Sequence, residues 1–152
     1  MTAVLQIATI TAAIADVTIT GLTISDFAGI PEQVDTRATA QLFPDPDVFV
    51  TELVVTNATH GYNTAAKNAD YKLNYVLAYK NIEAGRRFSD HIPAMVTMLG
   101  DIIETLTTTD FSAAGALHFD ISVPFMGKII DPAGNAFLGA KIIIDVMEFI
   151  QG

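Results

Sequence analysis

Three polar residues in the last third of the chain have the types that bind a metal ion. His118 and Asp120 are two residues apart in the alternating stretch 117–125, and Asp145 lies in the next strand-like stretch. Side chains two apart on a strand share a face, so all three are expected on the polar side of one hairpin. His and Asp alternating with apolar residues are also typical of any half-buried strand. The three histidines of the chain share no metal-ligand spacing, so we predict no metal site and no cofactor.

Other residue patterns that support catalysis are missing or have a structural explanation. No glycine pattern matches a phosphate-binding loop, no serine lies in a Gly-x-Ser-x-Gly motif, and the absence of cysteine excludes thiolate chemistry. Asp45 and Asp47 flank Pro46 in FPDPD, which is typical of a turn. Asp101 and Glu104 are three residues apart, as on the exposed face of a helix. We therefore predict no catalytic residue and no enzyme activity.

The elements that must position these residues are predicted from the periodicity of the apolar side chains. Helices are expected at 2–15 and 88–106, strands at 17–25, 47–58, 71–80, 117–125 and 140–150, and a long connection at 26–47. This order predicts one α+β domain over residues 1–152. Its antiparallel sheet has about five strands, two helices pack on one face, and a long loop follows the first strand.

Tyrosines mark one face of the strand expected at 71–80. Tyr71, Tyr75 and Tyr79 all point to the same side, because strand side chains alternate. We interpret this side as the inner face of the sheet, packed against the helices. The alternative is a strip that contacts another subunit, because tyrosine is enriched at interfaces.

Composition favours a folded protein that associates with other chains. Hydrophobic residues make up 51% of the 152 residues and charged residues 16%, which excludes disorder. The chain has 17 acidic and 8 basic residues, net −9, so tight binding to nucleic acid is not expected. No apolar run reaches the roughly 18 residues that span a bilayer. The first basic residue is Arg37, so we expect no secretory signal and a cytoplasmic site of synthesis.

The surplus of apolar area predicts that part of it is buried against other copies of the chain. The residues predicted to contact a neighbouring subunit lie in the long connection and in one basic turn: Pro31, Phe43, Pro44, Pro46, Arg86 and Arg87. The arginine pair has two interpretations, a solvated turn or an ion pair with the acid-rich segment of a neighbour before residue 60.

The order of elements and several phrases of the sequence resemble the tail terminator and tail-completion (neck) proteins of long-tailed bacteriophages. The features that carry the resemblance extend over nearly the whole chain: GIPEQVDTRATAQLFPDP after the first strand, the pair VFVTELVVTNA and YKLNYVLAYK, the amphipathic helix, and the hairpin around DPAGN that ends in VMEFIQ. These families share architecture more than sequence, and they supply no catalytic motif that could be transferred to this chain.

The resemblance implies a structural protein of the virion, made in the host cytoplasm. Such proteins form a homo-oligomeric ring, usually a hexamer, at the head-proximal end of the tail. The ring ends tube growth, contacts the tail tube protein and the head–tail connector protein, and lets DNA pass without specific binding; no membrane is involved. Two alternatives stay open: a tail tube or connector subunit, or a small ligand-binding or enzymatic domain. A large pocket lined by His118, Asp120 and Asp145 would favour the latter.

Overall fold

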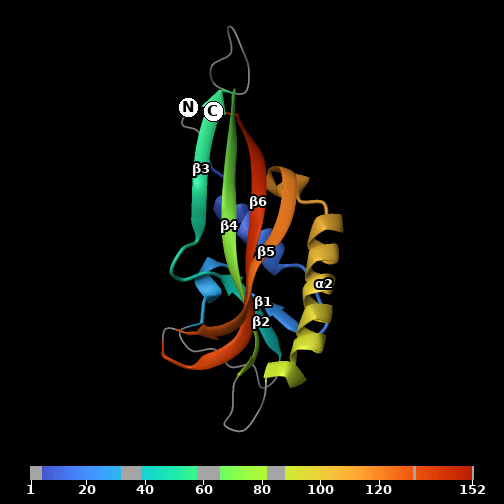
Figure 1. Ribbon diagram of the computed structural model, residues 1–152. Helices are drawn as coiled ribbons and strands as arrows, with labels where there is room; N and C mark the ends of the chain where they lie inside the picture. Colours follow the sequence, from blue (N-terminus) through green and yellow to red (C-terminus); the bar gives the residue numbers. More distant parts are fainter. Residues whose placement is uncertain (1–4, 32–38, 58–65, 82–87, 132, 152) are drawn as a thin grey trace.

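The computed structural model describes residues 5–31, 39–57, 66–81, 88–131 and 133–151 (Figure 1). Its helices are α1 (Ile7–Ala15) and α2 (Ile92–Thr108), and its strands are β1 (Leu22–Ile24), β2 (Ala40–Pro44), β3 (Val50–Asn57), β4 (Ala66–Asn81), β5 (Ala116–Ile130) and β6 (Ala136–Gln151). Short 3-10 turns lie at Phe27–Gly29, Phe88–Asp90 and Ser112–Ala114.

The strands form one six-stranded sheet that is antiparallel except at one pair. The order is β1-β2-β4-β6-β5, and β3 pairs with β4. β2 and β3 share one edge of β4: β2 pairs with residues 75–78 of β4, and β3 with residues 67–73. β1 and β2 form the one parallel pair among the described strands. The α+β prediction is therefore confirmed, with one strand more than the five expected.

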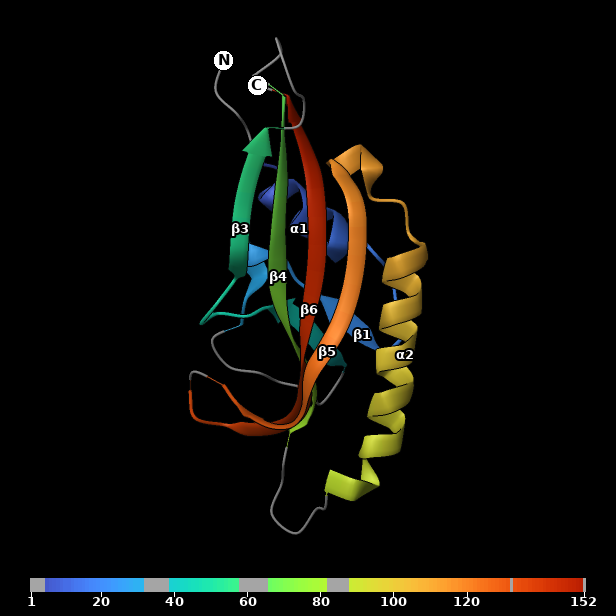
Figure 2. The same cartoon turned by 45° about the horizontal axis from the view of Figure 1, so that its top comes forward.

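Both helices pack on the same face of the sheet, also as predicted. Figures 1 and 2 show α1 behind β4 and β6, and α2 alongside β5. The residues that fill the main core come from the inward positions of the long strands and from one stripe of each helix: Tyr71, Leu73, Tyr75, Leu77, Ile142, Ile144, Val146, Ile10, Ile14, Met95, Leu99, Ile102 and Leu106. We call this side of the sheet the inner face and the opposite side the outer face.

Three boundaries differ from the prediction for local reasons. The strand expected at 17–25 is shortened to β1, because Gly21 turns the chain with a φ of 79° just before it. The helix expected from residue 88 begins at Ile92, after a 3-10 turn, with Pro93 in its first turn, where a missing N–H costs little. The first helix covers Ile7–Ala15; residues 1–4 of its expected range lie outside the described residues.

The long connection expected at 26–47 is wrong for part of its length. It contains the 3-10 turn Phe27–Gly29 and strand β2, while residues 32–38 lie outside the described residues. β2 has little sequence periodicity of its own. It forms because β3 covers only part of the edge of β4, and the remaining backbone groups of β4 accept a second strand.

The last hairpin is longer than expected and curls at its far end (Figures 1 and 2). β5 and β6 extend the predicted strands by five residues and four residues toward the turn, at Ile130 and Ala136. Register shifts between Ser122 and Phe125 in β5 and between Ala78 and Lys80 in β4 bend the sheet. The curl closes a second, smaller apolar cluster made by Phe43, Val76, Ala78, Ile129 and Phe137.

Within the described ranges, no helix combines the length and the apolar character that crossing a bilayer requires.

Candidate functional site

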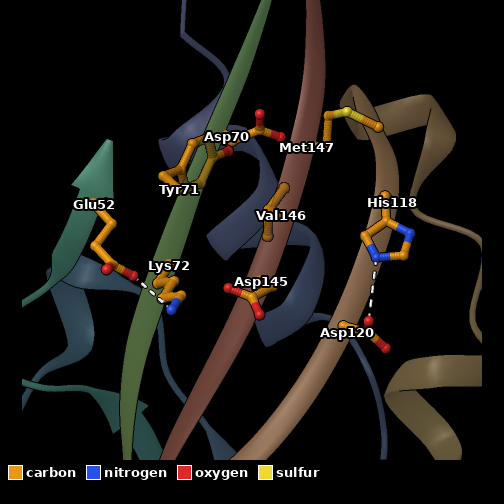
Figure 3. A pocket seen from close by; sticks show the side chains of 9 residues that line it. All are labelled: Glu52, Asp70, Tyr71, Lys72, His118, Asp120, Asp145, Val146 and Met147. Atoms are coloured by element: carbon orange, nitrogen blue, oxygen red, sulfur yellow. Dashed lines mark hydrogen bonds and ion pairs between the residues drawn. The ribbon is translucent and has the colours of Figure 1, made fainter. Parts of the chain in front are cut away.

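A shallow depression of about 360 Å³ lies on the outer face and crosses four neighbouring strands (Figure 3). Its lining combines acidic, basic and apolar groups of β3, β4, β6 and β5: Glu52, Asp70, Tyr71, Lys72, His118, Asp120, Asp145, Val146 and Met147. We call it the acidic depression. It is open to solvent along its length rather than enclosed.

The strand register places the polar side chains of this depression in one row. Lys72 of β4 is paired with Asp145 of β6, and Asp145 is paired with Asp120 of β5. His118 lies one position further along the same face of β5, as its two-residue spacing from Asp120 predicts. His118, Asp120 and Asp145 therefore do lie together, as the alternation in the sequence indicates (Figure 3).

Two close charge pairs organise the row. Lys72 Nζ is 2.5 Å from Glu52 Oε2, and this bond, with a further contribution from Asp145, raises the pKa of the lysine. His118 Nε2 is 3.2 Å from Asp120 Oδ2. Each basic group of the depression thus has its own carboxylate, and the surplus negative charge comes from the remaining acids.

This geometry does not resemble a water-shielded catalytic centre. The side chains of His118 and Asp120 are 56% and 71% exposed, so water competes for every hydrogen bond they make. Among the described residues, no group of three or more His, Cys, Asp or Glu side chains is arranged to hold a metal ion.

Four of the six residues predicted to contact a neighbouring subunit lie in the described part of the chain. Phe43 is 3% exposed and belongs to the second apolar cluster, and Pro44 is also buried, so little of either is left for a neighbour. Pro31 and Pro46 are half-buried. The pair at residues 86 and 87 (Arg86 and Arg87) lies outside the described residues.

Two of these residues line a second, smaller depression. Phe43 and Pro46 border a hollow of about 110 Å³ under the curled end of the β5–β6 hairpin. There Lys141 Nζ donates a hydrogen bond to Asp45 Oδ2 at 3.0 Å. Asp45 Oδ1 also accepts from the backbone N–H of Asp47 at 3.0 Å, which is the turn role that FPDPD predicts.

The tyrosines of β4 are core residues, which confirms the packing interpretation over the contact strip. Tyr71 and Tyr75 are buried, and Tyr79 packs half-buried against the same cluster. The Tyr75 hydroxyl has no hydrogen-bond partner among the described residues. Burial raises the pKa of Tyr75 well above its ordinary value, with a smaller contribution from Asp26.

A buried carboxylate that the sequence analysis missed ties the first helix to the sheet. Glu148 is fully buried on the inner face of β6. Its Oε1 accepts from the backbone N–H of Gln6 at 2.9 Å, and its Oε2 accepts from the Tyr71 hydroxyl at 2.6 Å. Gln6 immediately precedes α1, so Glu148 fixes where that helix begins. The signal was present: position 148 continues the inward series of Ile142, Ile144 and Val146.

The apolar side chains left exposed are concentrated in one short segment. Of the eleven large hydrophobic residues exposed in the described part of the chain, five lie between residues 48 and 55: Val48, Phe49, Leu53, Val54 and Val55. We call this segment 48–55. Most of it belongs to β3, whose described strand partner is β4 alone. The largely hydrophobic segment correctly predicts a strand, but such a segment is also typical of a strand buried on both sides, which β3 is not.

A β-bulge shapes this segment. The register between β3 and β4 shifts between Thr51 and Val54, and Glu52 has a left-handed φ of 56°, which is unusual for a residue other than glycine. Before the bulge, the Phe49 ring packs edge-on against Phe27 at 5.2 Å. The segment is therefore held in a defined conformation while its apolar side chains stay exposed.

No family model matches the sequence, and no curated protein matches it at a significant level. The features that bear on function are therefore those of the chain itself. They are the open acidic depression and the exposed apolar segment 48–55 on an edge strand.

Proposed function

We propose that this protein is a structural subunit that assembles with copies of itself into a ring, at the head-proximal end of the tail of a long-tailed bacteriophage. The observation that carries self-assembly is segment 48–55, an exposed apolar surface on a strand with one edge that no described strand covers. Native monomers protect such edges with charges, prolines or covering loops. Segment 48–55 has one charged residue and no proline.

The exposed apolar area contributes to holding subunits together. Leu53, Val54 and Val55 are each about half exposed. Burying such a side chain completely contributes about 1.5–3 kcal/mol, so covering the exposed half of all three contributes about 3 kcal/mol. That corresponds to roughly a hundredfold in the association constant of each contact, and each subunit of a closed ring takes part in two contacts.

Charge also favours this surface as the contact. The chain has a net charge of −9, so two copies repel each other over most of their surface. In strand β3 the one charged side chain is Glu52, and Lys72 of the same copy pairs with it. Two copies can therefore approach along β3 without bringing unpaired acids together.

The place in a phage particle rests on the resemblance of the sequence to tail terminator and neck proteins, together with the α+β fold. In such a ring the partners are the tail tube protein and the head–tail connector protein. If the acidic depression faces the channel, its carboxylates repel the DNA phosphates and let DNA pass without binding.

Light scattering after gel filtration tests the self-assembly. The wild-type protein should elute as a discrete oligomer, and electron microscopy should show rings. Val54→Lys should lower the assembly constant at least about tenfold, because it removes half-exposed apolar area and places an amine in the contact. Val96→Lys is the matched control: Val96 is 48% exposed on α2, against 53% for Val54, and its substitution should leave the oligomer intact. A protein that stays monomeric at tens of micromolar both alone and together with its tail partners would refute the proposal.

Two other functions remain candidates, each with its own test. Purified protein that polymerises into long tubes would favour a tail tube subunit, because a terminator must not stack on itself. A small ligand-binding or enzymatic domain is favoured by one observation, that His118, Asp120 and Asp145 line one depression. Its acids suit a cationic ligand, so a polyamine should then raise Tm in the wild type and not in Asp120→Asn.

A further inference from the structure

We infer that β3 of one copy pairs antiparallel with residues 118–122 of β5 in the next copy, so that the sheet continues from subunit to subunit. This inference rests on the proposed ring and adds the strand that receives segment 48–55. It follows from four features of the sheet: two edges that no described strand pairs with, the directions of the two strands, the position of one proline, and the distribution of charge.

In one part of the sheet, β3 and β5 each have an edge that no described strand pairs with, and α2 lies alongside β5 (Figures 1 and 2). Where β4 runs through residues 67–73, the strand order across the sheet is β3, β4, β6, β5, as Figure 1 shows. In the described part of the chain β3 has β4 as its strand partner, and β5 has β6. Each of these outer strands therefore presents one row of backbone N–H and C=O groups that no described strand covers.

The directions of the strands fit a repeating contact. Each neighbouring pair in the order β3, β4, β6, β5 is antiparallel, so β3 and β5 run in opposite directions. A copy related by rotation about an axis along the strands brings its β3 beside this β5 in antiparallel orientation. Antiparallel pairs are the more stable type, and this contact is heterologous, as ring closure requires.

A proline limits the accessible part of β5. Pro124 has no N–H to donate, and the register of β5 shifts between Ser122 and Phe125. Both features discourage strand pairing beyond residue 122. The register of β5 also shifts between Ala116 and His118, so its regular part is residues 118–122, which is shorter than the eight residues of β3.

The charges on the two strands do not oppose the contact. Strand β3 has one acid, Glu52, which pairs with Lys72 of its own copy. Residues 118–122 of β5 have one acid, Asp120, which contacts His118 of its own copy at 3.2 Å. Pairing the two strands therefore brings no unpaired acid into the subunit contact.

Engineered cysteines test the contact directly, because the natural chain has none. Val54 pairs with Asp70 and so lies on the outer face of β3, the face that His118, Asp120 and Ser122 occupy on β5. Val54→Cys is combined in one chain with His118→Cys, Asp120→Cys or Ser122→Cys, one pairing at a time. The assembled protein is oxidised mildly and run on a non-reducing gel, and circular dichroism confirms that each variant folds.

We expect one of the three combinations to give a covalent ladder that extends to the size of the ring. Facing positions of paired strands meet the Cα separation of a disulfide, and positions two residues away do not. Val54→Cys alone and Val54→Cys with Thr97→Cys, a control on the exposed side of α2, should give no ladder.

The outcomes separate this inference from the proposed function. A covalent dimer from Val54→Cys alone would show that β3 pairs with itself and would overturn the inference. A ring by light scattering with no ladder in any combination would also overturn it, while leaving the proposed function standing. A wild-type protein that stays monomeric with and without its tail partners would refute both.

Discussion

Gly139 provides a direct test of how closely β4 and β6 are packed. It is paired with Ala78 across the ladder, at the point where the register of β4 shifts. A Cβ atom at this position would overlap the carbonyl oxygen of Leu77, and it would also lie 3.1 Å from Ile129 Cδ1 and 3.1 Å from the ring of Phe137. A side chain could rotate away, but the Leu77 carbonyl belongs to the backbone of β4 and can move only if the ladder moves.

The expected cost of Gly139→Ala follows from that overlap. Forcing one extra carbon into a packed interior costs about 1–3 kcal/mol, and displacing the carbonyl weakens one or two ladder hydrogen bonds by about 1 kcal/mol each. The sum is about 3 kcal/mol. For a chain of this size, such a loss lowers Tm by roughly 6–12 °C.

Gly100 supplies the matched control. It lies in the exposed middle of α2, and a Cβ there would meet nothing within 4 Å. Gly100→Ala should therefore raise the free energy of unfolding by up to about 1 kcal/mol, through helix propensity alone. Urea and thermal unfolding of both variants and the wild type are compared at one protein concentration, because self-association adds to apparent stability. If Gly139→Ala lies within about 1 kcal/mol of the wild type, the packing described for β4 and β6 at this point is wrong.

The other predictions concern titratable groups. Tyr71→Phe leaves Glu148 Oε2 buried without its donor and should cost about 1–3 kcal/mol at neutral pH, measured by urea unfolding. Burial, and then Glu148, raises the pKa of Tyr71 above its ordinary 10.0. The contribution of Tyr71 to the free energy of unfolding is therefore complete below pH 10 and is lost as the pH rises further. Above pH 10, the Tm of Tyr71→Phe should decline less steeply than the Tm of the wild type. The Ser112 backbone N–H donates to Asp110 and lowers the pKa of Asp110 below its ordinary 3.8. The contribution of Asp110 to stability is therefore present at neutral pH and is lost as the pH falls below 3.8. Asp110→Asn should therefore be less stable than the wild type at pH 7, and the difference should shrink as the pH falls below 3.8; a difference that does not change with pH would contradict this.

Much of the architecture could be predicted from local patterns. The alternation in residues 71–80 and 117–125 predicted β4 and the first half of β5, with the correct side chains facing inward. The helical stripe from Met95 to Leu106 predicted most of α2, and the two-residue spacing of His118 and Asp120 predicted that they share a face. These predictions hold because the period of a strand or a helix is a property of consecutive residues.

Other features could not be predicted in this way. β2 forms because β3 leaves part of the edge of β4 without a strand, and the sequence of β2 alone does not show that this edge is open. The contact of Glu148 with the N–H of Gln6 joins positions 142 residues apart. The exposure of Val54 could not be predicted either, because the apolar pattern of a strand does not show whether the strand lies in the centre or at the edge of a sheet.

The sequence by itself determined which side chains share a face, that the chain is strongly acidic, and that thiol chemistry is absent, since each depends on residue type or on near neighbours along the chain. Only the tertiary structure decided which strand lies at the edge, which carboxylate is buried, and that Glu52, Lys72, Asp145 and Asp120 meet in one row. Strand pairing is the reason: its hydrogen bonds join distant residues, and the partner a strand receives depends on which other edges are already filled.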